Sequence, residues 1–366
     1  MNLDSANELA PVLFSDSYTA ARQKFLTATA GAKAYRCSTP GPSGEALYTD
    51  AAWYGPRDAR KLLILISGTH GPEGYCGSAS QLLFLRAGFH EKLPPSTAVL
   101  FVHALNCYGF AWDRRVTAEG CDLNRNFIDF SKPVPPNPGY EELHDYIVCE
   151  DISEEGLQRA EAALDAYKTK RGERQFQIAL TSGQYTRPGG AHFGGSGPTE
   201  ARRTLERIVA DHGVASREEV VIVDYHTGLG RFGYGELQCE QQSGLDGYER
   251  AKRIFGLSVT SPEIGNSSAV ELYGTQAEYW ERILGDRHTY VALEYGTLGV
   301  VKGPKTGFTR KDLWLFRYRP QDADTELGRG IRKLSKAYFY PQHPDWQEMI
   351  LCRSHQVHRQ ALEAFQ

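Results

Sequence analysis

Residues 64–74 read Ile-Leu-Ile-Ser-Gly-Thr-His-Gly-Pro-Glu-Gly, an apolar run that leads directly into a glycine-rich turn. The turn carries His70 and Glu73, three positions apart. A short apolar run bounded by turn residues is typical of a strand buried on both faces. Zinc that catalyses hydrolysis is typically bound by two histidines and one carboxylate, so this pair is a candidate for two of the three ligands. Because His-x-x-Glu also occurs by chance, the rest of the chain must supply a third ligand and a base.

Several apolar runs of this kind alternate with stretches that have the character of helices. The runs cover residues 61–67, 98–105, 220–225 and 290–294. The helical stretches cover residues 76–87, 153–170 and 199–212, after an opening helix at 17–31 and a short strand pair at about 46–54. The alternation predicts an α/β fold with a mixed, mostly parallel central sheet flanked by helices.

The 366 residues, 41% of them hydrophobic, suffice for one large core or two ordinary ones. We expect a single catalytic domain over residues 1–366, with a lead-in at about 1–55. A loop and helix insertion is expected at about 131–200, near the site. It holds two predicted loops, the proline-rich residues 131–140 and residues 185–198, where five glycines surround His192 and Phe193. Either loop serves as a lid or as a passive connection.

Composition narrows the class of partner. Lysine and arginine total 41 against 45 acidic residues, so no basic excess indicates a nucleic acid or an anionic membrane. The first 16 residues lack the cationic and apolar pattern of a secretory signal, and no later stretch is apolar enough to span a membrane. Seven scattered cysteines without a Cys-x-x-Cys pair fit a reducing cytoplasm. We expect a cytoplasmic protein that acts on a small molecule or peptide.

Polar candidates fall at the carboxyl ends of the predicted strands, where ligands bind in sheets of this type. They are His70, Asn106, His226 and Glu294. His226 is the candidate third ligand, although a buried structural histidine would fit the same position. Glu294 closes an apolar strand, which is costly unless the carboxylate is paired or near a metal. It is a candidate base, and a structural salt bridge is the alternative.

A second cluster covers residues 112–127 and holds three arginines together with asparagines and aspartates. Guanidinium groups bind carboxylates bidentately and stabilise an oxyanion as it develops, so the cluster is a candidate anion site. A solvated loop with surface ion pairs would have the same composition.

Taken together and in order, these motifs resemble the zinc carboxypeptidase superfamily, the M14 metallopeptidases, from about residue 61 to 297. The most specific piece is Asp-Leu-Asn-Arg-Asn-Phe at 122–127. Four further motifs are similar to those of the bacterial branch DUF2817. They are Ser-Gly-Thr-His-Gly-x-Glu-Gly, Gly-Phe-Ala-Trp-x-Arg-Arg, Asp-x-His-Thr-Gly-Leu-Gly and Glu-x-Gly-Thr. The resemblance implies a zinc carboxypeptidase-like, phosphorylase/hydrolase-like fold.

The resemblance also implies a role for each matching residue. His70, Glu73 and His226 would bind one zinc ion, and Asp122 would orient the first histidine. Arg115 would hold the oxyanion, and Glu294 would be the general base. Asn124 and Arg125 would bind the terminal carboxylate of the substrate. Tyr273 lies where a mobile tyrosine caps the substrate in the digestive carboxypeptidases.

The sequence therefore predicts a zinc-dependent hydrolase that cleaves an amide bond next to a free carboxylate, in a small peptide or an N-acyl amino acid. One alternative is a small-molecule deacylase or amidohydrolase of the aspartoacylase type. Another is a non-catalytic protein that binds zinc or a carboxylate. A serine or cysteine hydrolase is disfavoured, because Gly-Gly-Ser-Gly-Pro at 194–198 ends in proline where a nucleophile elbow has glycine.

Overall fold

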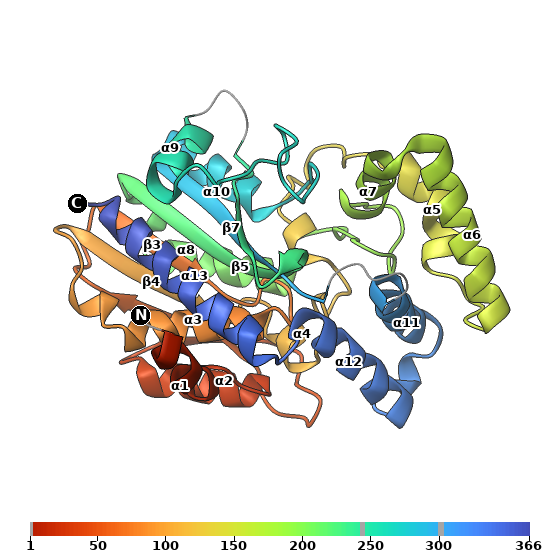
Figure 1. Cartoon of the computed structure of the whole chain (residues 1–366), viewed down its shortest axis with the longest axis horizontal. Helices are drawn as coiled ribbons and strands as arrows, with labels where there is room; N and C mark the ends of the chain where they lie inside the picture. Colours follow the sequence, from red (N-terminus) through yellow and green to blue (C-terminus); the bar gives the residue numbers. More distant parts are fainter. Residues whose placement is uncertain (1–2, 242–245, 299–303) are drawn as a thin grey trace.

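A mixed sheet forms the centre of the molecule (Figure 1). The computed structural model describes residues 3–241, 246–298 and 304–366, and within these residues the sheet has seven strands in the order β1-β2-β4-β3-β5-β7-β6. The strands are β1 Lys33–Arg36, β2 Tyr48–Tyr54, β3 Lys61–Ile66, β4 Thr97–His103, β5 Glu219–Phe232, β6 Gly235–Gln238 and β7 His288–Gly296. Neighbours among β4, β3, β5 and β7 are parallel, whereas β1, β2 and β6 join antiparallel pairs. The predicted α/β architecture is confirmed.

Strand register brings the ends of the central strands to one edge. Ile66, the last residue of β3, pairs with Asp224 on β5, and His226 two residues later pairs with Glu294 on β7. Side chains alternate between the faces of a strand, so Asp224 and His226 share one face. The predicted strand-end residues therefore converge at the carboxyl edge of the sheet.

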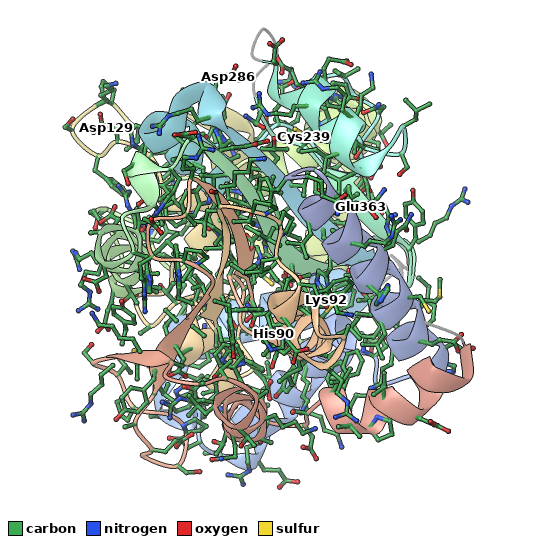
Figure 2. The ribbon with its side chains drawn as sticks, turned by 90° about the vertical axis from the view of Figure 1, so that its left-hand side faces the viewer. His90, Lys92, Asp129, Cys239, Asp286 and Glu363 are labelled. Carbon is green, nitrogen blue, oxygen red and sulfur yellow. The ribbon has the colours of Figure 1, made fainter. Side chains whose placement is uncertain are left out.

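Helices cover both faces of the sheet, each over its own apolar cluster. One face packs against α1 Leu3–Leu13, α2 Tyr18–Ala28, α3 Gly74–Arg86, α4 Cys107–Ala111, α9 Gly247–Phe255 and α13 Pro344–Glu363. The view in Figure 2 shows α13 along one side of the molecule, with Glu363 at its end. The other face packs against α8 Glu200–Asp211 and α10 Gln276–Leu284. Burial of each large apolar side chain in such a layer stabilises the fold by about 1.5–3 kcal/mol.

The remaining helices form an outer lobe, which Figure 1 shows at one end of the molecule. It comprises α5 Pro138–Ile147, α6 Glu154–Arg171, α7 Glu173–Thr181, α11 Pro304–Tyr318 and α12 Glu326–Phe339. A small separate cluster joins α5, α6 and α7 to α11 through residues such as Tyr140, Leu164, Phe176 and Leu313. None of the helices in the described part of the chain is long and apolar enough to cross a membrane.

Two local predictions need correction. The expected strand pair at about 46–54 is wrong, because only β2 lies there and its partner β1 comes from residues 33–36. The proline-rich stretch 131–140 is not a loop throughout, because α5 begins at Pro138. Asn137 caps that helix, its side chain accepting a hydrogen bond from the Tyr140 backbone N–H, and proline is favoured in the first helical turn.

Candidate metal centre and active site

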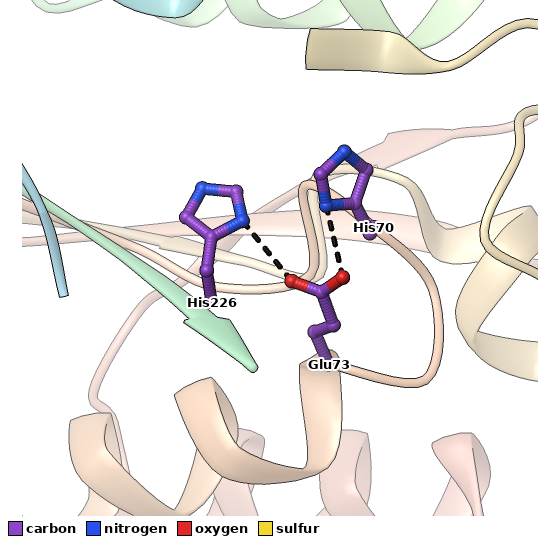
Figure 3. A group of neighbouring side chains, drawn as sticks. All are labelled: His70, Glu73 and His226. Atoms are coloured by element: carbon purple, nitrogen blue, oxygen red, sulfur yellow. Dashed lines mark hydrogen bonds and ion pairs between the residues drawn. The ribbon is translucent and has the colours of Figure 1, made fainter. Parts of the chain in front are cut away.

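His70, Glu73 and His226 meet at the carboxyl edge of the sheet, as Figure 3 shows. His70 lies in the turn after β3, Glu73 precedes α3, and His226 lies on β5. All three are buried, and their candidate ligand atoms lie within 4.8 Å of one another. Glu73 stands between the two rings, with Oε1 3.0 Å from His70 Nδ1 and Oε2 3.0 Å from His226 Nδ1. Two imidazole nitrogens and a carboxylate oxygen are the donor set of a hydrolytic zinc site.

Close packing of the backbone fixes the turn that carries His70 and Glu73. A Cβ atom on Gly71 would lie only 2.1 Å from the backbone oxygen of Arg114 and the backbone carbon of Gly109. Any side chain there would push the turn away from the segment that also carries Arg115. Glycine at this position is therefore required for the two site segments to approach each other.

The outer nitrogens of both histidines contact carboxylates. His70 Nε2 lies 3.0 Å from Asp122 Oδ1, and His226 Nε2 lies 2.8 Å from Asp224 Oδ2. A carboxylate accepts only from an N–H, so the Nε2 atoms carry protons, and the Nδ1 atoms that face Glu73 would offer their lone pairs to a metal ion bound there. Arg115 Nη2 also lies 3.0 Å from His70 Nε2, but it is a donor and cannot replace Asp122 as the proton's acceptor. Such outer carboxylates orient the histidines that bind a metal.

Two observations indicate that the cluster suits a cation. His70 Nδ1 is buried and makes no hydrogen bond among the described residues, although Glu73 is at ion-pair distance. Burial acts to lower the pKa of His226, but Asp224 and Glu73 outweigh it and raise this pKa well above its usual value. The raised pKa shows that negative charge favours a cation at this point, where a metal ion would take the place of the proton, and the residues present fit a divalent metal ion.

Asp224 is a site residue that the sequence prediction missed. Besides His226 it accepts hydrogen bonds from Thr69 Oγ1 at 2.8 Å, Gln276 Nε2 at 2.7 Å and Tyr290 Oη at 3.2 Å. Its side chain is fully buried, so these donors replace water. The available signal was its position two residues before His226, on the same face of the strand.

Arg115 hydrogen-bonds both Glu73 in the cluster and Asp122 behind His70. Its Nη1 donates to Glu73 Oε1 at 2.9 Å, and its Nη2 donates to Asp122 Oδ2 at 3.2 Å. Burial opposes ionisation of Asp122, but Arg115 and then His70 outweigh it and hold the pKa of Asp122 well below its usual range. The Arg115 side chain is 27% exposed, in contrast to 1% for both carboxylates. Its guanidinium is thus accessible from solvent beside the cluster.

Glu294 lies beside His226 through the pairing of β5 and β7. Its Oε1 accepts a hydrogen bond of 2.9 Å from the Leu229 backbone N–H. Burial, followed by the negative charge of Glu73, raises the pKa of Glu294 to about 7. A carboxyl group with such a pKa exchanges a proton readily near neutral pH, as a general base must.

Asn124 and Arg125 lie in a buried turn directly after Asp122. Asn124 Oδ1 accepts from the Gln276 backbone N–H at 2.8 Å. Arg125 donates through Nε and Nη2 to the Thr181 carbonyl at 3.0 and 2.7 Å, and through Nη1 to the Asn124 carbonyl at 2.7 Å. These bonds use three of the five N–H groups of a guanidinium and leave two for another acceptor.

Tyr273 is placed differently from the other predicted residues. Its side chain is 45% exposed, and its backbone N–H donates to the Ser182 carbonyl at 3.0 Å. Within the described residues, no hydrogen bond links its hydroxyl to the cluster. The hydroxyl of Tyr338 on α12 lies nearer to the cluster than that of Tyr273, because Glu294, Arg115 and Glu73 all act electrostatically on it. The sequence prediction did not include Tyr338, which reaches the site from the far end of the chain.

His192 is a further missed residue. It lies in the predicted loop at 185–198, and its Nδ1 is 3.0 Å from Asp122 Oδ2. The glycine-rich composition indicated a loop, but nothing in the sequence indicated that this loop returns to Asp122.

The fold and the site define an α/β protein with a buried His-Glu-His cluster at the carboxyl edge of its sheet. The chain belongs to the family described as "Protein of unknown function (DUF2817)", which matches residues 14–353. The predicted relationship to this branch is confirmed. No curated protein matches the sequence.

Solved structures similar to this chain include a fibrinolysis inhibitor, an amidase and a desuccinylase. Bovine thrombin-activatable fibrinolysis inhibitor is 12% identical, with 88% of this chain and 96% of that chain covered and a TM-score of 0.42. The murein-tripeptide amidase MpaA from Escherichia coli O157 is 15% identical, with coverages of 84% and 92% and a TM-score of 0.34. The succinylglutamate desuccinylase from Chromobacterium violaceum is 13% identical, with coverages of 90% and 76% and a TM-score of 0.38.

Proposed function

We propose that the protein is a zinc-dependent hydrolase that cleaves an amide bond next to a free carboxylate. The observation that carries this proposal is the buried His70–Glu73–His226 cluster, whose two outer nitrogens contact Asp122 and Asp224. Zinc is the metal that this donor set favours. When bound there, it would lower the pKa of a water molecule and polarise the scissile carbonyl.

The surrounding residues would carry out the remaining chemistry. Glu294, next to His226, would take a proton from the attacking water and later deliver it to the leaving amine. Arg115 would stabilise the oxyanion through its exposed guanidinium. Asn124 and Arg125 would position the substrate, with the two remaining N–H groups of Arg125 binding its carboxylate.

Two substrate classes are compatible with this machinery, and the site residues are the same for both. A carboxypeptidase releases the terminal amino acid of a peptide. A deacylase of the aspartoacylase type releases an acyl group from an amino acid.

Incubation of the zinc-loaded protein with pooled peptides that have free C-termini, and separately with pooled N-acyl amino acids, tests the proposal. We expect release of an amino acid from at least one pool, loss of release on chelation, and recovery with zinc. Release from the N-acyl pool alone would assign the deacylase activity. Turnover that survives complete removal of metal would contradict the proposal.

A further inference from the structure

His192 is held in place from several directions. Its backbone has a φ of 50°, a left-handed conformation that costs energy in residues other than glycine and occurs often at functional sites. The Gln184 backbone N–H donates to its carbonyl at 3.1 Å, and the Asp122 N–H donates to the carbonyl of the next residue, Phe193, at 2.8 Å. Ala191 and Phe193 on either side are buried. The loop therefore presents the imidazole at one fixed position.

The His192 ring keeps one nitrogen available as an acceptor. Because Asp122 is an ionised carboxylate, Nδ1 must carry the proton that bonds it, which leaves the lone pair on Nε2. Burial lowers the pKa of His192 to about 4, so the ring is neutral at physiological pH. Nε2 has no hydrogen-bond partner in the part of the chain that the structure describes, and 18% of the side chain is exposed.

Besides the anionic Asp122, two cationic side chains lie near His192. Asp122 Oδ2 accepts from His192 Nδ1 at 3.0 Å and from Arg115 Nη2 at 3.2 Å, so imidazole and guanidinium meet on one oxygen. Arg125 is also close enough for its charge to act on the ring. His192 is thus a neutral acceptor next to two arginines that can only donate.

A substrate of the proposed class has hydrogen-bond donors and acceptors that match these three side chains. Its scissile carbonyl and its free carboxylate are acceptors, which suit Arg115 and Arg125. Between them lies one donor, the N–H of the scissile amide. Building on the proposed function, we propose that His192 Nε2 accepts this N–H and makes the enzyme selective for secondary amides.

Three matched substrates test the role of His192: an N-acyl amino acid, its N-methyl amide, and the ester with oxygen in place of N–H. His192→Phe keeps a planar ring but removes the acceptor. We expect its kcat/KM for the secondary amide to fall about tenfold relative to wild type, the usual effect of losing one hydrogen bond. The values for the N-methyl amide and the ester should fall much less, so the preference for the secondary amide should largely disappear.

Arg187→Gln is the matched control, since Arg187 lies on the same loop and its exposed side chain pairs with Glu141. It should keep the wild-type preference. An equal fall for all three substrates in His192→Phe, with weaker zinc binding, would overturn the proposal and show that His192 only supports Asp122.

The same substrates distinguish a failure of the proposed function from a failure of the proposed role of His192. If the wild-type protein hydrolyses none of the three substrates, the hydrolase assignment fails. Calorimetric titration of the zinc-loaded protein with the N-acyl amino acid and its N-methyl amide then still decides the role of His192. Tighter binding of the secondary amide in wild type but not in His192→Phe supports the role, and equal preference in both proteins overturns it.

Discussion

At the scale of the residue, two carboxylates, Asp122 and Asp224, contact the outer nitrogens of the histidines in the candidate metal site. Asp224 contacts His226 and accepts bonds from Thr69, Gln276 and Tyr290 in a buried position. A ligand histidine without its outer carboxylate loses both its orientation and part of its basicity.

We therefore expect Asp224→Asn to weaken zinc binding by about 10- to 100-fold. Competition with a chromophoric chelator measures this affinity. Asp211→Asn is a suitable control, because Asp211 is a partly exposed carboxylate that pairs with Lys33 on β1, the edge strand of the sheet, which is not a neighbour of β5. Equal zinc affinity in Asp224→Asn and wild type would show that Asp224 has no part in the metal site.

Glu294 gives a second prediction at this scale. Glu294→Gln should keep zinc but lower kcat by about 10²–10⁴-fold, because the amide cannot take the proton from water. Metal analysis and steady-state kinetics on the same sample separate the two effects. Unchanged turnover would remove Glu294 from the mechanism.

The pKa of Glu294 also predicts a pH profile. The carboxyl must be ionised to act as a base, and burial together with Glu73 raises its pKa to about 7. Activity should fall as the pH drops through this pKa. A bound cation offsets the charge of Glu73, so kcat/KM of the wild type should decline at or below about pH 7. A profile that rises toward acid pH would contradict this assignment.

The structure brings together the predicted residues that have a local signal in the sequence. His70 and Glu73 lie in the turn that follows β3, His226 lies on β5 and Glu294 lies on β7, and the parallel register of these strands brings the four residues together. The contact between His192 and Asp122 spans 70 residues and depends on how a glycine-rich loop folds back. No periodicity or spacing encodes such a contact.

At the scale of the element, apolar runs predicted the central strands well, because strands buried on both faces need continuous apolar sequence. The sequence did not predict β6 or α5, because each has only a weak local signal. β6 has only four residues, and α5 follows a proline-rich stretch whose capping signal is a single Asn137.

Asn137 also links α5 to the segment at residues 179–183 through hydrogen bonds. Its Oδ1 caps α5, and its Nδ2 donates to the carbonyls of Ala179 at 3.0 Å and Gly183 at 2.9 Å. The Thr181 carbonyl between them holds Arg125. The geometry of this lobe thus bears directly on the predicted carboxylate-binding group.

Asn137→Ala should destabilise the lobe by about 1–3 kcal/mol through loss of the cap and of partly buried hydrogen bonds. Hydrogen exchange should become faster over residues 138–181 but not in β3 or β5. Asn137→Ser, which keeps a capping oxygen and loses the amide donors, should have a smaller effect. Exchange that is unchanged over the lobe would show that Asn137 does not hold it.

At the scale of the whole molecule, buried neutral histidines couple stability to pH. Burial lowers the pKa values of His103 and His358 to about 3, well below the ordinary 6.5. Both rings are fully buried, and His103 stacks on Phe25 with ring centroids 4.3 Å apart. In the unfolded chain these groups take up protons below pH 6.5, whereas the folded protein resists protonation down to about pH 3.

The free energy of unfolding should therefore be fully maintained above pH 6.5 and fall as the pH decreases below it. His103→Phe keeps the stacked ring and removes one titrating group. It should reduce the slope of this decline by about 1.4 kcal/mol per pH unit between pH 4 and 6. Denaturant unfolding across this range measures the slope. His343→Asn, at an exposed position, should leave the slope unchanged, and an unchanged slope in His103→Phe would contradict the prediction.

We propose that His70, Glu73 and His226 together bind one catalytic zinc ion. The decisive experiment is elemental analysis after equilibration with zinc and exhaustive dialysis. We expect one zinc per chain in the wild type and far less than one in Glu73→Gln, with both proteins folded by circular dichroism. Wild-type protein that retains no zinc, or Glu73→Gln protein that retains as much as the wild type, would contradict the claim.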